Sequence, residues 1–351
     1  MAAASKRKAN SMSPNRGTDS EIERPNEFDD SDSSTKKAKS LHELQTGSTN
    51  DKASSSNAVS EKIDKFEDKY FSIEADAAEN KGSRHTMEDA WVVLHDASLE
   101  SPGNLRCAHF AVYDGHGGRL AADYAQKHLH RNVLSSGLPR ELLDVKSAKK
   151  AILDGGWQDG ATAVCVWVLG QTVFVANIGD AKAVVARTSE TDCSKDVMDR
   201  SNSLKAIVLT REHKAIYPQE RARIQKAGGS VSSNGRLLGR LEVSRAFGDR
   251  NFKKVGVVAT PDVHSFTLTE RDHFIILGCD GLWGVFGPID AVEFVHKLLK
   301  EGLPAAAVSR HLVREAVRER RCKDNCTAIV MIFKKQYLIS PNISSGLRVS
   351  V

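Results

Sequence analysis

Acidic residues stand at the ends of the apolar segments of this chain, and this arrangement restricts its fold more than any other feature. Three aspartates follow segments rich in valine, isoleucine or aromatic residues, and two further acidic positions precede such segments: Asp114, Asp180, Asp280, Glu88-Asp89 and Asp324. One aspartate beside a glycine is most simply a turn residue. Several such positions predict that strand ends converge on one cleft, where Mg²⁺ or Mn²⁺ relieves the repulsion between the carboxylates.

Short segments rich in β-branched residues predict strands, and they occur in neighbouring groups rather than in strict alternation with helices. The predicted strands span 91–94, 106–113, 162–169, 172–178, 183–186, 206–209, 263–268, 274–278 and 327–333. Apolar periodicity predicts helices at 118–136, 141–153, 217–227, 288–301 and 304–321. Grouped strands and paired helices favour an α+β sandwich.

Residues 1–65 differ from the rest of the chain. Thirteen of the first sixty residues are serine and few are large and apolar, so we expect this segment to be disordered. It holds two basic clusters, 6–8 and 36–39. Clusters of this kind occur in nuclear import signals but are more often only solvated charge, and acidic residues balance their charge here. We therefore expect a tail at 1–65, a globular domain at 66–335, a C-terminal tail at 336–351, and a location in the nucleus, the cytoplasm or both.

Composition argues against several classes of protein. A formal charge of +5 and an aromatic content of 6% do not favour nucleic-acid binding, and polar residues interrupt the most apolar stretch, 161–178, so we expect no membrane span. Six cysteines are too few for a disulfide scaffold. Cys322 and Cys326 have no second pair of thiols with which to form a zinc site. The chain also lacks a Cys-x₅-Arg signature, a Gly-x₄-Gly-Lys-Ser/Thr loop and a Gly-x-Ser-x-Gly elbow.

Seven short motifs, taken in order, resemble those of the protein phosphatase 2C family, the metal-dependent serine/threonine phosphatases. They are RHTMED at 84–89, DGHGG at 114–118, GDAK at 179–182, SRAFGD at 244–249, TPD at 260–262, CDGLW at 279–283 and DN at 324–325. The resemblance runs from about residue 71 to residue 333. Within the family, the chain is similar to plant members and to the integrin-linked-kinase-associated branch. The resemblance implies two central antiparallel β-sheets sandwiched between helix pairs, phosphorylated proteins as substrates, and a monomeric enzyme.

The resemblance also implies two Mg²⁺ or Mn²⁺ ions and their ligands. Asp114 corresponds to the carboxylate that bridges both ions. Asp280 and Asp324 correspond to ligands of one ion, and Glu88 and the Gly115 carbonyl correspond to ligands of the other, directly or through water. Two close ions of this kind activate a water molecule for attack on phosphorus.

Four further residues receive roles from the same resemblance. Asp89 belongs to the acidic metal-binding set, and Asp180 corresponds to a ligand of a third ion. Arg84 corresponds to the arginine that holds two phosphate oxygens in a fork. His116 corresponds to the proposed general acid, which protonates the leaving serine or threonine oxygen.

Two departures from the family pattern lead to an alternative hypothesis. Gly284 stands where the family often has an acid that helps to hold the third ion, so we expect weak occupancy of that third site. The predicted helix at 141–153 is shorter than the helix usual in the family, and Gly155-Gly156 end it. A shortened helix leaves apolar surface uncovered, which motivates the alternative of an inactive scaffold that binds phosphoproteins without turnover.

Overall fold

The computed structural model of the protein describes residues 70–98, 106–135, 159–188 and 204–336. All of them belong to one compact unit, Lys65–Val351. The predicted tail at 1–65, the predicted helix at 141–153 and all but the first residue of the predicted tail at 336–351 lie outside these ranges.

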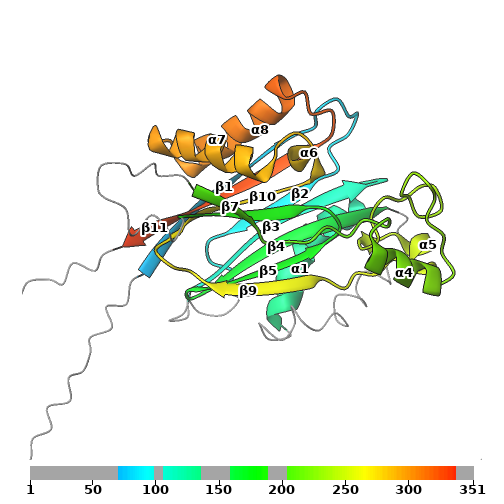
Figure 1. Cartoon of the computed structure of the whole chain (residues 1–351). Coiled ribbons are helices and arrows are strands. Elements are labelled where there is room, and N and C mark those ends of the chain that lie inside the picture. Colours follow the sequence, from blue (N-terminus) through cyan, green and yellow to red (C-terminus); the bar gives the residue numbers. More distant parts are fainter. Residues whose placement is uncertain (1–69, 99–105, 136–158, 189–203, 337–351) are drawn as a thin grey trace, which may run out of the picture. The chain divides into compact units, whose positions relative to one another are not determined.

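Two antiparallel sheets form the centre of this unit (Figure 1). The five-stranded sheet has the order β1 (Tyr70–Asn80), β11 (Cys326–Gln336), β10 (Asp272–Gly278), β6 (Lys182–Thr188) and β7 (Leu204–Val208). The other sheet has the order β2 (Ala90–Leu94), β3 (Cys107–His116), β4 (Gly160–Leu169), β5 (Thr172–Ile178) and β9 (Asp262–Thr267), and the short strand β8 (Phe247–Gly248) pairs with β4. The sequence therefore predicted the α+β class correctly.

Successive side chains of a strand point to opposite faces of the sheet, and in the central strands apolar side chains are buried on both faces. In β3, Phe110 and Val112 belong to the apolar cluster between the two sheets, together with residues of β10 such as Ile275. The intervening residues Ala111 and Tyr113 belong to the cluster on the outer face of the same sheet. Burial on both faces explains why β3 reads as an almost unbroken apolar segment.

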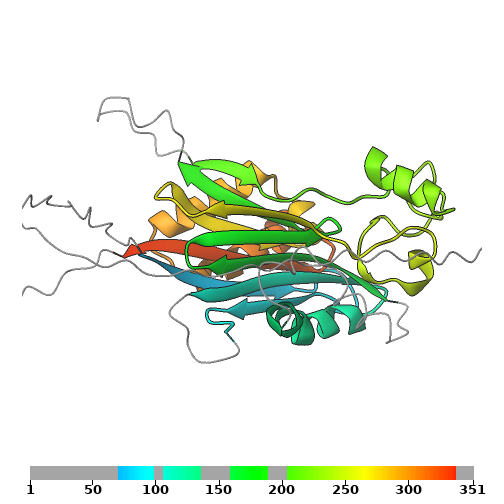
Figure 2. The ribbon, with the colours of Figure 1, turned by 90° about the horizontal axis from the view of Figure 1, so that it is seen from below.

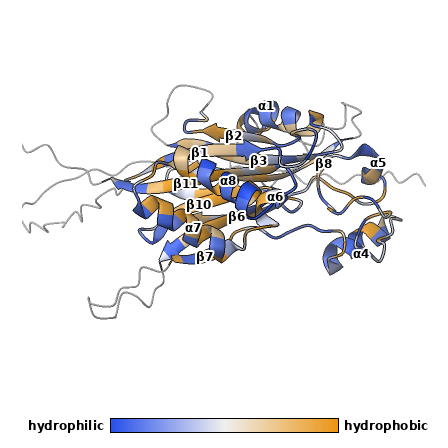
Figure 3. Cartoon of the chain, turned by 90° about the horizontal axis from the view of Figure 1, so that it is seen from above, coloured by the Kyte–Doolittle hydropathy of each residue, from blue (hydrophilic) through white to orange (hydrophobic). Residues whose placement is uncertain are grey.

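Helices cover the outer faces of the sheets. The helices α7 (Pro288–Lys300) and α8 (Ala305–Arg314) pack on the five-stranded sheet through residues such as Val292, Val295 and Leu312. The helix α1 (Leu120–Ser135) packs on the other sheet through small residues such as Ala122 and Ala125. Figure 3 shows that α7 carries both hydrophobic and hydrophilic residues, as expected for a helix with one face toward a core.

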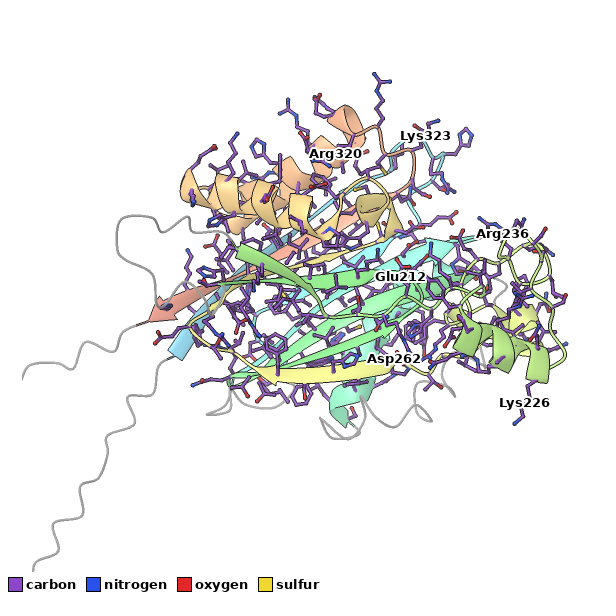
Figure 4. All side chains as sticks on the ribbon, in the orientation of Figure 1. Glu212, Lys226, Arg236, Asp262, Arg320 and Lys323 are labelled. Carbon is purple, nitrogen blue, oxygen red and sulfur yellow. The ribbon has the colours of Figure 1, made fainter. Side chains whose placement is uncertain are left out.

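Residues 209–261, between β7 and β9, form a separate lobe at one end of the sheets (Figure 2). This β7–β9 lobe contains the helices α4 (Pro218–Lys226) and α5 (Arg250–Lys253) and carries Arg236 and Lys226 (Figure 4). Its small apolar core includes Ile224, Leu237 and Val257. The lobe therefore has packing of its own, apart from the core between the sheets.

The nine predicted strands all exist, each within a few residues of its expected bounds. The sequence did not predict β1, because its buried positions include the small Ala75 and its other positions include acids, so that no clear apolar alternation appears. The last helix ends sooner than predicted, at Arg314, since a wider π-helical turn over Glu315–Glu319 follows, with the Arg320 amide bonded to the Glu315 carbonyl at 3.0 Å. None of the helices in the described ranges is long and apolar enough to cross a membrane.

Candidate active site

The predicted site residues meet at one end of the two sheets. Asp114 lies near the end of β3 in one sheet, and Asp280 follows β10 of the other and begins the short helix α6 (Asp280–Trp283). Asp180 lies in the turn that leads from β5 to β6, and hence from one sheet to the other. Together with other predicted residues they line a cleft of about 620 Å³, namely Arg84, Glu88, Gly115, His116 and Asp324.

Asp89 is the one predicted site residue that lies beneath the cleft rather than on its wall. Its side chain is buried, and Asp89 accepts a hydrogen bond of 2.6 Å from the Thr327 hydroxyl of β11. Burial raises the pKa of Asp89 to about 6, and the charge of Asp324 contributes to this rise.

Three carboxylates form the centre of the cleft. One oxygen each of Asp114, Asp180 and Asp280 lies within 4.8 Å of the other two. Loss of water around Asp114, together with the charges of Asp280 and Asp89, raises the pKa of Asp114 well above its ordinary value. Desolvation and the charge of Asp180 also raise the pKa of Asp280, to about 7. Without a cation, these acids therefore oppose one another's ionisation.

These residues fit a hard divalent cation. Their donors are all carboxylate oxygens, and the carboxylate of Asp114 accepts no hydrogen bond from any residue of the described ranges. Lys214 of the β7–β9 lobe brings positive charge nearby, with its Nζ 3.6 Å from Asp180, but this amine also pairs with Glu242 at 2.8 Å. A single shared ammonium group does not balance three close carboxylates.

Asn325 holds the loop that leads into β2 against the rest of the site. Its Oδ1 accepts a hydrogen bond of 2.7 Å from the Glu88 amide, and its Nδ2 donates to the carbonyls of Lys81 and Thr86 at 3.0 and 2.9 Å. Gly115 permits the close packing of this loop on β3, because a Cβ at that position would overlap the Glu88 carbonyl. Glu88 is thus fixed beside Asp114 through its backbone.

Arg84 lies on the same loop and projects into the open part of the cleft. Its side chain is 61% exposed, and its Nη2 donates to Asp324 Oδ2 at 2.6 Å. The pair is too exposed to contribute much to stability. The guanidinium group is therefore available for an anion that enters the cleft.

His116 contacts an aspartate to which the sequence motifs alone assigned no role. Its Nε2 lies 2.7 Å from Asp249 Oδ2, which the β7–β9 lobe supplies. Burial alone would lower the pKa of His116, but the hydrogen bond and charge of Asp249 outweigh it and raise this pKa.

Comparisons with known proteins identify the family. The family described as protein phosphatase 2C matches residues 73–326. The chain belongs to the protein phosphatase 2C family. Probable protein phosphatase 2C 8 of Arabidopsis thaliana is 67% identical over 321 residues, which cover 86% of this chain and 92% of the relative.

More distant members of the family agree with this assignment. The integrin-linked kinase-associated serine/threonine phosphatase 2C of Bos taurus is 36% identical, over 81% of this chain and 83% of its own. The crystal structure of a serine-threonine phosphatase 2C from Toxoplasma gondii shares the fold, with a TM-score of 0.61 and 24% identity over 76% of this chain and 96% of that chain. The protein is a serine/threonine phosphatase of plant type within the 2C family, and these relatives favour that function over the inactive scaffold.

Three residues of this phosphatase belong to recognised motifs but received no role from the sequence. Asp249 and Arg245 lie in the SRAFGD motif, and Asn325 lies in the DN motif. Their contacts join segments far apart in the chain, such as 116 with 249 and 88 with 325. The motifs marked these residues, whereas their partners follow only from the fold.

Proposed function

We propose that the cleft between Asp114, Arg84 and His116 is where this phosphatase hydrolyses phosphoserine and phosphothreonine in proteins, and that it uses two Mg²⁺ or Mn²⁺ ions. The observation that carries the proposal is the close approach of Asp114, Asp180 and Asp280, within 4.8 Å of one another. Such a set of carboxylates is stabilised by hard divalent cations.

The predicted ligands of the two ions keep their proposed roles. Asp114 would contribute to holding both ions, together with Asp280 and Asp324 for one ion and with Glu88 and the Gly115 carbonyl for the other. When bound, the ions supply positive charge to the phosphoryl oxygens and a water of lowered pKa. Asp89 lies beneath the cleft and accepts a hydrogen bond from Thr327, and it would act on the metal ligands above it through its charge.

The remaining cleft residues act on the substrate. Arg84 is exposed at the mouth of the cleft and presents a planar fork of donors that fits two phosphate oxygens. For this, Arg84 exchanges its contact with Asp324 for one with the phosphate. His116 donates a proton to the serine or threonine oxygen as that oxygen leaves phosphorus.

A third ion near Asp180 is not part of the proposal. Gly284 offers no carboxylate, and the Lys214 ammonium group already lies 3.6 Å from Asp180. A titration of the purified protein with Mn²⁺ by calorimetry should therefore give two ions per chain, and three ions of similar affinity would contradict this count.

The principal test measures phosphate release from a phosphothreonine peptide by the full chain, with Mn²⁺, with Mg²⁺ and with EDTA, beside a thermal melt of the same sample. We expect turnover with the metals and none with EDTA, and a cooperative melt in each case. Turnover that EDTA does not change would reject the metal mechanism. A folded protein that binds the peptide with Mn²⁺ but releases no phosphate would restore the scaffold hypothesis.

We also propose that the enzyme is monomeric and resides in the nucleus, the cytoplasm or both. The support for the location is the pair of basic clusters at 6–8 and 36–39. Fusion of residues 1–65 to a reporter should enrich it in the nucleus, and charge-neutral replacement of both clusters should abolish this enrichment. Light scattering should give a mass near 38.3 kDa for the monomer.

A further inference from the structure

We propose that Asp249 is the positioning residue of the general acid: it fixes the His116 ring through Nε2 and thereby makes Nδ1 the nitrogen that faces the substrate. The proposal rests on the function proposed above, in which His116 protonates the leaving oxygen. It adds a residue from the β7–β9 lobe to the machinery of the cleft and specifies the atom of His116 that donates the proton.

Asp249 and His116 are in direct contact. Asp249 Oδ2 lies 2.7 Å from His116 Nε2, a distance typical of a charge-assisted hydrogen bond. Only 3% of the Asp249 side chain is exposed, against 31% of His116. The carboxylate is thus protected from water, while part of the ring remains open to the cleft that both residues line. His116 Nδ1 has no hydrogen-bond partner among the residues of the described ranges.

Hydrogen bonds also fix the backbone of Asp249. Asp249 adopts a left-handed conformation with φ of 53°, which is uncommon for a residue other than glycine. Its amide donates to the Asp159 carbonyl at 2.9 Å, and its own carbonyl accepts from the amides of Phe252 and Lys253 at 2.9 and 3.0 Å. Three hydrogen bonds therefore hold this residue in the conformation that aims its side chain at His116.

A glycine leaves the space in which the two side chains meet. Gly160, at the start of β4, pairs with His116 of β3 in one direction and with Gly248 of β8 in the other. A Cβ on Gly160 would overlap both His116 Nε2 and Asp249 Oδ2. The contact between histidine and aspartate thus passes directly over a residue that has no side chain.

The chemistry of the leaving group follows from this arrangement. Nε2–H donates to Asp249 and keeps its proton throughout, so the proton for catalysis is on Nδ1. As the bond between phosphorus and the serine or threonine oxygen breaks, its electron pair stays with that oxygen, which takes the Nδ1 proton. A water oxygen bonds to phosphorus and releases its proton to solvent, and solvent returns a proton to Nδ1.

The test compares two substrates that differ in their need for this proton. The alkoxide of a phosphothreonine peptide must be protonated as it leaves, whereas the phenolate of p-nitrophenyl phosphate leaves without a proton. For Asp249→Asn in the Mg²⁺-loaded full chain, we expect the ratio of kcat on the peptide to kcat on p-nitrophenyl phosphate to fall about tenfold or more. The exposed Glu293→Gln on α7 is the matched control and should leave this ratio unchanged.

The outcomes separate the proposal from the function on which it rests. His116→Ala should lower the same ratio, and the double variant should lower it no further than His116→Ala alone. If His116→Ala slows both substrates equally, the proposed acid role of His116 fails. If His116→Ala changes the ratio but a folded Asp249→Asn does not, the positioning role of Asp249 fails.

A measurement on the unaltered protein covers the case in which Asp249→Asn does not fold. Nitrogen-15 NMR of the Mg²⁺-loaded enzyme should show a proton on Nε2 of His116, in a hydrogen bond that protects it from exchange with water. A neutral His116 with its only proton on Nδ1 would overturn the proposal.

Discussion

At the scale of single residues, the carboxylates of the candidate metal site repel one another, and a bound cation would remove this repulsion. Asp114 lies within reach of Asp180 and Asp280, and its pKa is raised by burial and by those neighbours. A carboxyl whose pKa is higher in the folded than in the unfolded protein destabilises the fold once the pH exceeds its unfolded value. At neutral pH, the repulsion between these carboxylates therefore lowers the free energy of unfolding of the metal-free enzyme, and a bound cation relieves this repulsion.

The Asp114→Asn variant should change both the stability of the metal-free protein and its response to metal. Without metal, the amide removes one of the opposed charges, so the melting temperature should rise by about 3 °C, as for ~1 kcal/mol in a domain of this size. With Mn²⁺, the variant should lack the stabilisation seen in the unaltered enzyme, and kcat should fall at least about 100-fold. A variant with normal kcat would show that Asp114 does not bridge the ions.

Asn325 should matter more than its neutral side chain suggests. Asn325→Ala removes three hydrogen bonds that hold the Glu88 loop, with an expected loss of about 2–4 kcal/mol in the free energy of unfolding. Because the loop carries Glu88, the affinity for Mn²⁺ measured by calorimetry should also fall, about 10–100-fold. Asn80→Ala removes a single exposed hydrogen bond to Gly82 in the same loop and is the control. Equal Mn²⁺ affinity in both variants would contradict a role for Asn325 in holding the ligand.

The sequence predicted the acids of the site better than their supports. Asp114 and Asp280 were identifiable because each follows an apolar segment of the sequence, and the ends of neighbouring strands can meet at one edge. The partners of His116 and Glu88 were not, since Asp249 and Asn325 are 133 and 237 residues away in the chain. Such contacts depend on the pairing of whole strands, which local residue patterns do not record.

At the scale of elements, β1 shows why one strand escaped prediction. Its Glu74 does not merely face solvent: Glu74 Oε1 accepts a hydrogen bond of 2.6 Å from the Ala305 amide at the start of α8, and Oε2 pairs with Lys334 of β11. Pro304 precedes α8 and offers no side-chain cap. Glu74, which interrupts the apolar pattern of β1, thus caps the first turn of α8, far away in the chain.

Replacement of Glu74 by alanine should therefore weaken the junction between β1 and α8. We expect a loss of about 1 kcal/mol in the free energy of unfolding, as for other helix caps, and a melting temperature lower by about 3 °C. The control is Glu293→Gln on the exposed face of α7. Activity with saturating Mn²⁺ should be unchanged at 25 °C, because β1 and α8 do not line the cleft. An unaltered melting temperature would show that Glu74 does not cap α8.

At the scale of the whole molecule, a buried ionic network joins the β7–β9 lobe to the sheets. Arg245 bonds to Glu220 of α4 at 2.7 Å and to Asp262 of β9 at 2.8 Å (Figure 4 labels Asp262). Burial alone would raise the pKa of Glu220, but hydrogen bonds from Arg245, Ser244 and Arg223 lower it to about 2. Asp262 likewise has a pKa of about 2, because its contacts with His213 and Arg245 outweigh its burial.

These lowered pKa values predict how the stability of the enzyme depends on pH. A carboxyl whose pKa is lower when folded contributes stability above its unfolded value, about 4 for these side chains, and loses that stability as the pH falls toward the folded value of about 2. Glu220→Gln should therefore lower the urea midpoint at pH 7, where the charge is present in the unaltered protein. The difference between the two proteins should shrink as the pH falls from 5 to 2, because Glu220 then takes up a proton and loses its charge. The control Glu293→Gln should show no such pH-dependent difference in urea midpoint. If the midpoint of Glu220→Gln stays below that of the unaltered protein by a constant amount down to pH 2, the fold depends on the shape of Glu220 rather than on its charge.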